Sequence, residues 1–269
     1  MSSLTITLIQ TNLFWENKKT NLDMLQRKIE SIQEKTEIVI LPEMFTTGFS
    51  MKPELFAEKM DGETVQWMKK IAADKKIILT GSLIIEDSSS NAPDGKYFNR
   101  LIWMLPNGEF GIYDKRHLFA FANEHDHYTA GNKKLIASVK GWKINLQICY
   151  DLRFPVWSRQ SPGEIENKHD LMINVANWPE KRNIAWKTLL RARAIENQCF
   201  VAGVNRVGED GKNIYYNGES SVIDPLGEII YQKKDQEDIF TCTLSKEKIT
   251  ETRNTFPFWQ DADEFTIHQ

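Results

Sequence analysis

The sequence predicts an α/β protein in which two mixed β-sheets pack together and are covered by helices. Three observations carry this prediction. Short apolar runs alternate with amphipathic helical segments early in the chain, two hairpin signals stand far apart, and further buried strands lie between those hairpins. A doubly wound three-layer sheet is the alternative that these patterns leave open.

The first elements alternate between strand and helix. Residues 4–9 are short and β-branched, and residues 37–41 form a nearly continuous apolar run that is typical of a strand buried on both faces. A second helix is expected over residues 63–74 and a long strand over residues 76–85. The first helix is marked by apolar residues spaced three and four apart, namely Leu22, Leu25, Ile29 and Ile32.

Two hairpins make the sheets mixed. Residues 98–105 and 109–113 flank Pro106-Asn107-Gly108, and residues 221–223 and 228–231 flank an Asp-Pro-Leu-Gly turn. Each turn favours antiparallel pairing of the strands on either side of it. The two strands of each pair are therefore expected to be neighbours in a sheet.

The rest of the chain supplies buried strands at residues 142–149 and 170–176 and an amphipathic helix at residues 183–197, with Pro179 suited to the first turn. Residues 86–96 are rich in Ser, Pro and Gly and predict a surface loop. That loop is too short to separate two domains. We therefore expect one domain over residues 1–269.

Composition narrows the class of protein. The chain carries 34 Lys and Arg against 37 Asp and Glu, a net charge of −3, which argues against a nucleic-acid partner. Its three cysteines are far apart and form neither a disulfide framework nor a CxxC pair. No signal peptide is visible, and no apolar run approaches the ~18 residues that span a bilayer. We expect a soluble, cytoplasmic protein with no membrane partner.

Cys149 is the first candidate for chemistry. It follows a buried strand and precedes a helix start, where the helix dipole lowers a thiol pKa and backbone N–H groups can hold an oxyanion. The alternative is a buried cysteine that merely ends a strand. Cys199 and Cys242 lie inside apolar runs and are interpreted as core residues.

Glu43 and Lys115 also follow apolar runs. At the carboxyl end of a buried strand, Glu43 is placed to act as a general base, although a capping or salt-bridged glutamate would look the same. Lys115 belongs to a charged run, residues 114–117, between a hairpin strand and the apolar residues 118–122, where it could stabilise a tetrahedral transition state. The alternative for this run is a solvated face.

Taken together, the segments LPEMF, YDKRHLF and CYDLRFP, in that order, resemble the nitrilase (carbon–nitrogen hydrolase) superfamily. The resemblance implies a four-layer α-β-β-α sandwich that forms a homodimer or a higher homo-oligomer through its outer helices. It also implies a catalytic set of Glu43, Lys115 and Cys149. Glu124 matches a second glutamate that often lies near the lysine and the cysteine in this family.

The finer pattern is similar to the ω-amidase branch, which hydrolyses the distal amide of 2-oxoglutaramate and 2-oxosuccinamate. The segments that carry this resemblance are residues 43–49, 115–119, 123–125, 177–179 and 191–197. The implied reaction passes through a covalent thioester on Cys149 and needs no metal or organic cofactor. Glu43 would be the base, Lys115 and the backbone N–H of Tyr150 would hold the oxyanion, and Glu124 would orient Lys115.

Such a substrate is a small-molecule amide with a carboxylate remote from the reacting group, and a guanidinium suits that carboxylate. Arg153 and Arg182 are the first candidates and Arg116 the third, with a structural ion pair as the alternative for each. Three aromatic residues next to the motifs could wall the pocket or belong to the core, namely Phe45, Phe119 and Trp178.

Three other possibilities stay open. Another branch (a nitrilase, an N-carbamoyl amidohydrolase or a deaminated-glutathione amidase) would use the same residues, and a binding module could keep the fold without the chemistry. The triplet His125-Asp126-His127 contains metal-ligand types without a further cluster nearby in sequence. The aromatic segment at residues 256–259 is expected to pack on a neighbouring surface, such as a dimer partner.

Overall fold

Two sheets form the centre of the computed structural model, which describes residues 2–87, 96–160 and 168–267. The first sheet has six strands in the order β13-β1-β2-β3-β4-β5. Their bounds are β13 Asp238–Ser245, β1 Ser3–Gln10, β2 Ile38–Ile40, β3 Ile78–Asp87, β4 Lys96–Met104 and β5 Phe110–Asp114.

The second sheet has seven strands in the order β10-β11-β9-β8-β7-β6, with β12 paired to β11. Their bounds are β10 Val207–Glu209, β11 Tyr215–Ile223, β9 Phe200–Asn205, β8 Leu171–Ala176, β7 Trp142–Ile148, β6 Ile136–Val139 and β12 Ile229–Lys234. Both sheets contain parallel and antiparallel pairs. The prediction of two mixed sheets is confirmed.

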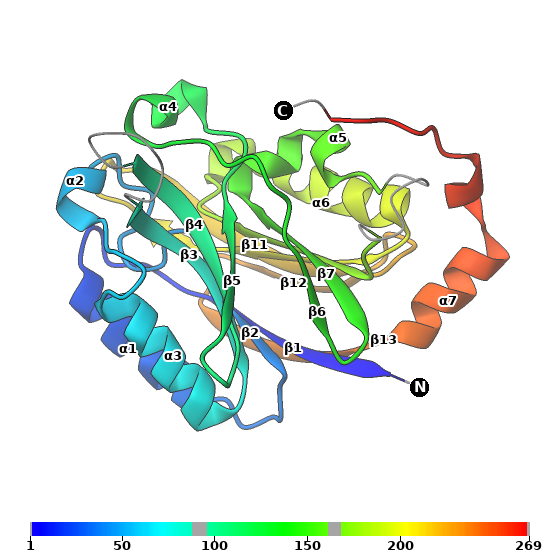
Figure 1. Ribbon diagram of the computed structural model, residues 1–269, viewed down its shortest axis with the longest axis horizontal. Helices are drawn as coiled ribbons and strands as arrows, with labels where there is room; N and C mark the ends of the chain where they lie inside the picture. The colour runs from blue at the N-terminus through cyan, green and yellow to red at the C-terminus, as the bar shows by residue number, and fades with distance from the viewer. Residues whose placement is uncertain (1, 88–95, 161–167, 268–269) are drawn as a thin grey trace.

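Helices cover the outer face of each sheet, so that the molecule has four layers (Figure 1). On one side lie α1 (Lys18–Glu30) and α3 (Glu63–Lys75), and on the other lie α5 (Pro155–Ser158) and α6 (Asn183–Asn197). Shorter helices are α2 (Pro53–Phe56) and α4 (Glu124–His127), and α7 (Lys246–Thr255) follows β13. The α-β-β-α sandwich replaces the three-layer alternative.

Three apolar clusters hold these layers together. Alternate residues of β1, such as Leu4, Ile6 and Leu8, enter the core between the sheets because successive strand side chains point to opposite faces. A second cluster joins the first sheet to α1 and α3, and a third joins the second sheet to α6. Trp186 and Leu190 of α6 enter that third cluster from the same helical face.

The local predictions hold at both hairpins and at the main helices. Strands β4 and β5 pair antiparallel around residues 105–109, and β11 and β12 pair around residues 224–228. Helix α6 has the predicted bounds. Most of the predicted loop at residues 86–96 lies outside the described residues, and its ends belong to β3 and β4.

Candidate active site

The predicted acids and the predicted lysine meet in one buried cluster. Glu43 follows β2, Lys115 follows β5 directly, and Glu124 begins α4. All three side chains are inaccessible to solvent. Lys115 Nζ donates to Glu43 Oε1 at 3.0 Å and to Glu124 Oε1 and Oε2 at 3.0 and 2.9 Å. One ammonium group therefore lies between two carboxylates.

Glu43 is held by donors from both sheets. The backbone N–H of Asn177, the residue after β8, donates to Oε2 at 2.7 Å, and Asn99 Nδ2 of β4 donates to Oε1 at 2.8 Å. The Asn177 side chain also donates to the backbone carbonyl of Glu43 at 2.6 Å. These bonds fix the carboxylate in one orientation, which a positioned base requires.

Burial and charge act against each other in this cluster. Burial disfavours the charged ammonium of Lys115, but Glu124 and Glu43 outweigh it and raise the lysine pKa above its ordinary value. Burial raises the pKa of Glu124, with a further rise from Glu43, while Lys115 opposes the shift. The backbone N–H of Phe119 donates to Glu124 Oε2 at 2.6 Å. Lys115 is therefore a permanent cation held in place by Glu124.

Cys149 lies where β7 ends and a short 3₁₀ helix, η2 (Cys149–Arg153), begins. Its φ of 44° is in the left-handed region, which a residue with a side chain adopts only when its surroundings impose it. Its Sγ is 4.0 Å from the carbonyl oxygen of Asn177. The nucleophile candidate is thus presented on a strained turn beside the residue that holds Glu43.

The predicted lowering of the Cys149 pKa is wrong. Burial raises the pKa of this thiol well above its ordinary value, and the nearby Glu43 carboxylate raises it further through its charge and a hydrogen bond to the thiol. Lys115 opposes the rise without cancelling it. The five-residue helix η2 supplies little helix dipole. The resting group is a neutral thiol beside a carboxylate that can take its proton.

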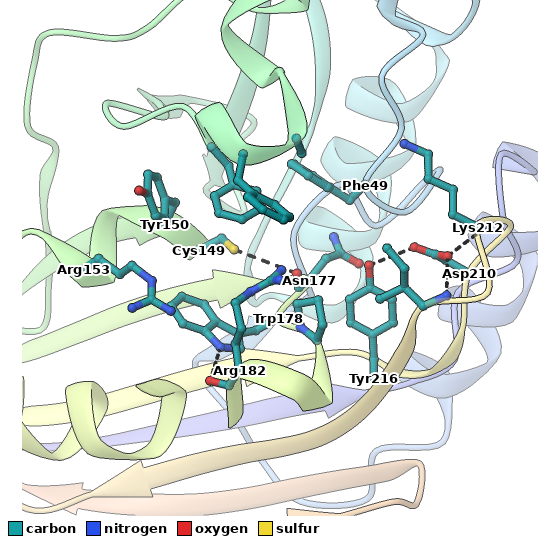
Figure 2. A pocket seen from close by; sticks show the side chains of 15 residues that line it. Phe49, Cys149, Tyr150, Arg153, Asn177, Trp178, Arg182, Asp210, Lys212 and Tyr216 are labelled. Carbon is teal, nitrogen blue, oxygen red and sulfur yellow. Dashed lines mark hydrogen bonds between the residues drawn. The ribbon is translucent and has the colours of Figure 1, made fainter. Parts of the chain in front are cut away.

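A cavity of about 190 Å³ opens at Cys149 (Figure 2). Among its lining residues are the predicted Phe119, Tyr150, Arg153, Trp178 and Arg182. Figure 2 shows Cys149, Arg153 and Arg182 toward one end of the view and Asp210, Lys212 and Tyr216 toward the other. The cavity therefore brings the thiol, aromatic walls and three cations together.

Both predicted pocket arginines lie on aromatic faces. The Arg153 guanidinium is 5.0 Å from the Trp178 ring centroid, and that of Arg182 is 5.0 Å from the Phe119 ring centroid. Within the described ranges, neither arginine takes part in a salt bridge, so the ion-pair alternative finds no support there. The guanidinium donors remain open to a ligand in the cavity.

Two candidates for substrate contact lie elsewhere. Phe45 is fully buried, with its ring 6.1 Å from that of Trp67 in the core beneath α3, and it does not line the cavity. The chain turns at Met44, whose φ is 42°, and Phe49 is the aromatic residue of this segment that lines the cavity. Arg116 donates to the carbonyl of Gly131 and also lies outside the lining.

Several residues of the site were not predicted. Asn177 follows an apolar strand, as Lys115 and Cys149 do, so its position carried a usable signal. Asn99 lies inside β4, and nothing in its local sequence indicates that it reaches Glu43. Asp210 and Tyr216 line the cavity from the hairpin of β10 and β11, where the tyrosine hydroxyl donates to Asp210 at 2.9 Å.

Neither metal binding nor membrane insertion finds support in the parts of the chain that the structure covers. His125 and His127 are exposed on α4, and the described residues contain no cluster of three or more potential metal ligands. No helix among the described residues has the length and apolarity needed to cross a bilayer.

Comparisons with known proteins agree with this geometry. The chain is 43% identical over 268 residues to omega-amidase YafV of Escherichia coli strain K12, covering 99% of this chain and all of the relative. It is 32% identical over 262 residues to 2-oxoglutaramate amidase of Bacillus subtilis, covering 96% of each chain. The crystal structure of XC1258 from Xanthomonas campestris, a CN-hydrolase superfamily protein with an arsenic adduct in its active site, matches with a TM-score of 0.94 and 45% identity over the full length of both chains. Residues 5–254 match the carbon–nitrogen hydrolase family model, and the chain belongs to that family.

Proposed function

We propose that this protein is an ω-amidase. It hydrolyses the distal amide of a 2-oxo dicarboxylic acid monoamide, such as 2-oxoglutaramate or 2-oxosuccinamate, to the 2-oxo acid and ammonia. The observation that carries the proposal is the position of Cys149 between the buried Glu43–Lys115–Glu124 cluster and a small cavity. That cavity is lined by Arg153 and Arg182, neither of which forms an ion pair with another described residue. The names of the relatives from Escherichia coli and Bacillus subtilis support the same reaction.

The first half of the reaction forms a thioester. As Cys149 Sγ attacks the amide carbon, its proton passes to the nearby Glu43 carboxylate. The carbonyl oxygen becomes an oxyanion, stabilised by the Lys115 ammonium and the backbone N–H of Tyr150. Glu43 then returns the proton to the amide nitrogen, and ammonia leaves as the carbon–nitrogen bond breaks.

The second half releases the acid. Glu43 takes a proton from a water molecule as that water attacks the thioester carbon, and the same two donors stabilise the second oxyanion. The carbon–sulfur bond then breaks, and the proton on Glu43 returns to the sulfur of Cys149. Glu124 touches no reacting atom in this scheme. It keeps Lys115 charged and directed at the oxyanion.

The cavity supports a small anionic substrate. A space of about 190 Å³ suits a short monoamide better than the larger substrates of deaminated-glutathione amidases. In the proposed complex the substrate carboxylate binds Arg153 or Arg182, whose donors face the cavity, and the carbon chain contacts Phe119 and Trp178.

The proposal extends to the setting of the enzyme. A single catalytic domain spans residues 1–269 and acts in the cytoplasm, which the three free cysteines support. A second copy of the chain covers the outer face of α6, where Ile184 and Ile195 are 81% and 50% exposed. Neither a cofactor nor a metal takes part.

Ammonia release from 2-oxoglutaramate tests this function. The parent protein is expected to turn over this monoamide, and Cys149→Ala and Cys149→Ser are expected to lose activity by at least about a thousandfold. Cys242→Ala is the matched control, because Cys242 lies on β13 away from the cavity. The proposal fails if the parent releases no ammonia from 2-oxoglutaramate, or if an N-carbamoyl acid, a nitrile or deaminated glutathione gives a higher kcat/KM.

A further inference from the structure

Asp151 is a buried carboxylate that the proposed reaction does not use. It lies two residues after Cys149 on η2, is inaccessible to solvent and does not line the cavity. Four hydrogen bonds converge on its two oxygens. A buried carboxylate needs such partners, and those of Asp151 come from two different segments of the chain.

One donor comes from the segment that carries the nucleophile. The backbone N–H of Ile148, the residue immediately before Cys149, donates to Asp151 Oδ2 at 3.1 Å. This bond closes the turn on which Cys149 adopts its left-handed backbone conformation. If Asp151 only capped η2, this bond would be sufficient.

The other three donors come from the segment that carries the catalytic lysine. The Tyr113 hydroxyl donates to Oδ2 at 2.7 Å, and the backbone N–H of His117 donates to Oδ1 at 2.9 Å. His117 Nδ1 lies 2.8 Å from the same Oδ1. Tyr113 and His117 are the residues two before and two after Lys115, so Asp151 binds both sides of the lysine.

We propose that Asp151 is a positioning residue that sets the separation between the Lys115 ammonium and the Cys149 thiol. It joins the end of β5 in the first sheet to the end of β7 in the second, at the residues that flank the two reacting groups. The role assigned to it rests on the proposed amidase reaction, in which Lys115 must lie against the oxyanion that forms on attack by Cys149.

The partners of Asp151 are themselves fixed. Trp157 Nε1 donates to the Tyr113 oxygen at 2.9 Å, and the His117 ring stacks on Phe154 with centroids 3.7 Å apart. Burial, together with the Asp151 charge, raises the pKa of Tyr113 well above its ordinary value, so its hydroxyl remains a donor. The Tyr113 and His117 side chains therefore have little freedom to move with the Asp151 carboxylate if it is displaced.

Asp151→Asn tests the inference, because it keeps the shape of the side chain but replaces one oxygen by an NH₂ group. Whichever oxygen is replaced, the NH₂ group faces two hydrogen-bond donors and the bonds to them are lost. The rate of ammonia release from 2-oxoglutaramate is divided by the concentration of reactive Cys149. That concentration is the amount of protein that carries an acrylamide adduct on Cys149 once the labelling reaction is complete. We expect kcat to fall at least about tenfold while KM stays within about twofold. Tyr113→Phe removes one of the four bonds and is expected to lower kcat less. The double variant is expected to be no slower than Asp151→Asn alone.

Asp224→Asn is the matched control, since Asp224 is a buried turn aspartate that accepts backbone N–H bonds in the distant β11–β12 hairpin. It should retain the parent kcat. The inference is overturned if Asp151→Asn keeps kcat within about twofold of the parent, or if its loss only matches a loss of reactive Cys149. Independent, multiplying effects of Asp151→Asn and Tyr113→Phe would also overturn it.

Two further outcomes are informative. If Asp151→Asn does not fold, Tyr113→Phe decides: a several-fold fall in kcat at unchanged KM supports the inference, and an unchanged kcat overturns it. If the parent releases no ammonia, the proposed function fails separately. The rate of acrylamide addition to Cys149 then decides, because displacement from Glu43 and Lys115 slows it and an unchanged rate overturns the inference.

Discussion

The Glu43–Lys115–Glu124 cluster and the cavity wall hold their cations in opposite ways. Lys115 is buried between two carboxylates with three hydrogen bonds, whereas Arg153 and Arg182 rest on aromatic rings and form no salt bridge within the described ranges. A group that must stabilise a brief oxyanion is organised before substrate arrives. A group that must bind a stable carboxylate keeps its donors available, so that the ligand supplies the missing partner.

The largest expected effect comes from removing the organised cation. Lys115→Met leaves Glu43 and Glu124 facing each other without a cation, which should lower kcat about a thousandfold and the free energy of unfolding by about 3–5 kcal/mol. Ammonia release and denaturant unfolding measure the two losses. Lys28→Met, which removes a pair with the half-exposed Glu237, should change stability by less than about 1 kcal/mol. Equal losses in the two variants would refute the contrast between buried and exposed pairs.

A cavity arginine should affect binding more than chemistry. Arg182→Met is expected to raise KM for 2-oxoglutaramate at least about tenfold and to change kcat much less, because it removes a partner of the remote carboxylate. Arg116→Met, outside the cavity lining, should leave KM unchanged. A fall in kcat at constant KM in Arg182→Met would show that the arginine serves the reacting end instead.

Phe45 and Phe49, which directly follow Met44 and Gly48, should affect different properties of the protein. Phe45→Leu alters the core and is expected to lower stability by about 1 kcal/mol with little change in KM. Phe49→Leu alters the cavity wall and is expected to raise KM a few-fold with little change in stability. Steady-state kinetics and thermal unfolding distinguish them, and the reverse assignment would place Phe45 in the binding site.

The smallest expected effect concerns the ionisation of Cys149, which should give no thiolate absorbance at neutral pH. A raised pKa means that a smaller fraction of Cys149 is ionised at any given pH, so the sulfur should be a neutral thiol at neutral pH and should ionise only in alkaline solution. Thiolate ultraviolet absorbance of the parent minus that of Cys149→Ser measures this directly. A thiolate signal at neutral pH would instead support the lowered pKa that the position of Cys149 before a helix start predicts.

Sequence patterns predicted the features that depend on residues close together in the chain, such as strand ends and hairpins. Lys115 and Cys149 stand at the ends of apolar strands, and both hairpins carry their own turn residues. Strand β13 lay outside the prediction, although Phe240, Cys242 and Leu244 alternate as in a strand. Its pairing with β1 is made only when distant parts of the chain meet.

The sequence-based predictions failed for properties that are set by contacts between residues distant in the chain. The Cys149 pKa is raised first by burial and then by the charge of Glu43, which is distant in sequence. Phe45, a candidate for the pocket wall, belongs to the core, and Phe49, for which no role was predicted, lines the cavity. The backbone takes positive φ at Met44 and Gly48, the residues before them. The roles of Asn99 and Asp151 depend on partners distant in sequence, Glu43 and Tyr113, so no single short motif contains both members of either pair.

The pairing of β1 with β13 places Ser3 opposite Ser245, so the first strand of the chain is completed by one of the last. In Figure 1 β1 lies beside β13, and contacts between such distant segments make folding slow. A growing chain holds Glu43, Lys115 and Cys149 well before it can close the sheet that contains β1. Recovery of amidase activity after dilution from denaturant should therefore wait for this pairing, whereas the burial of Trp186 between the second sheet and α6 does not require it.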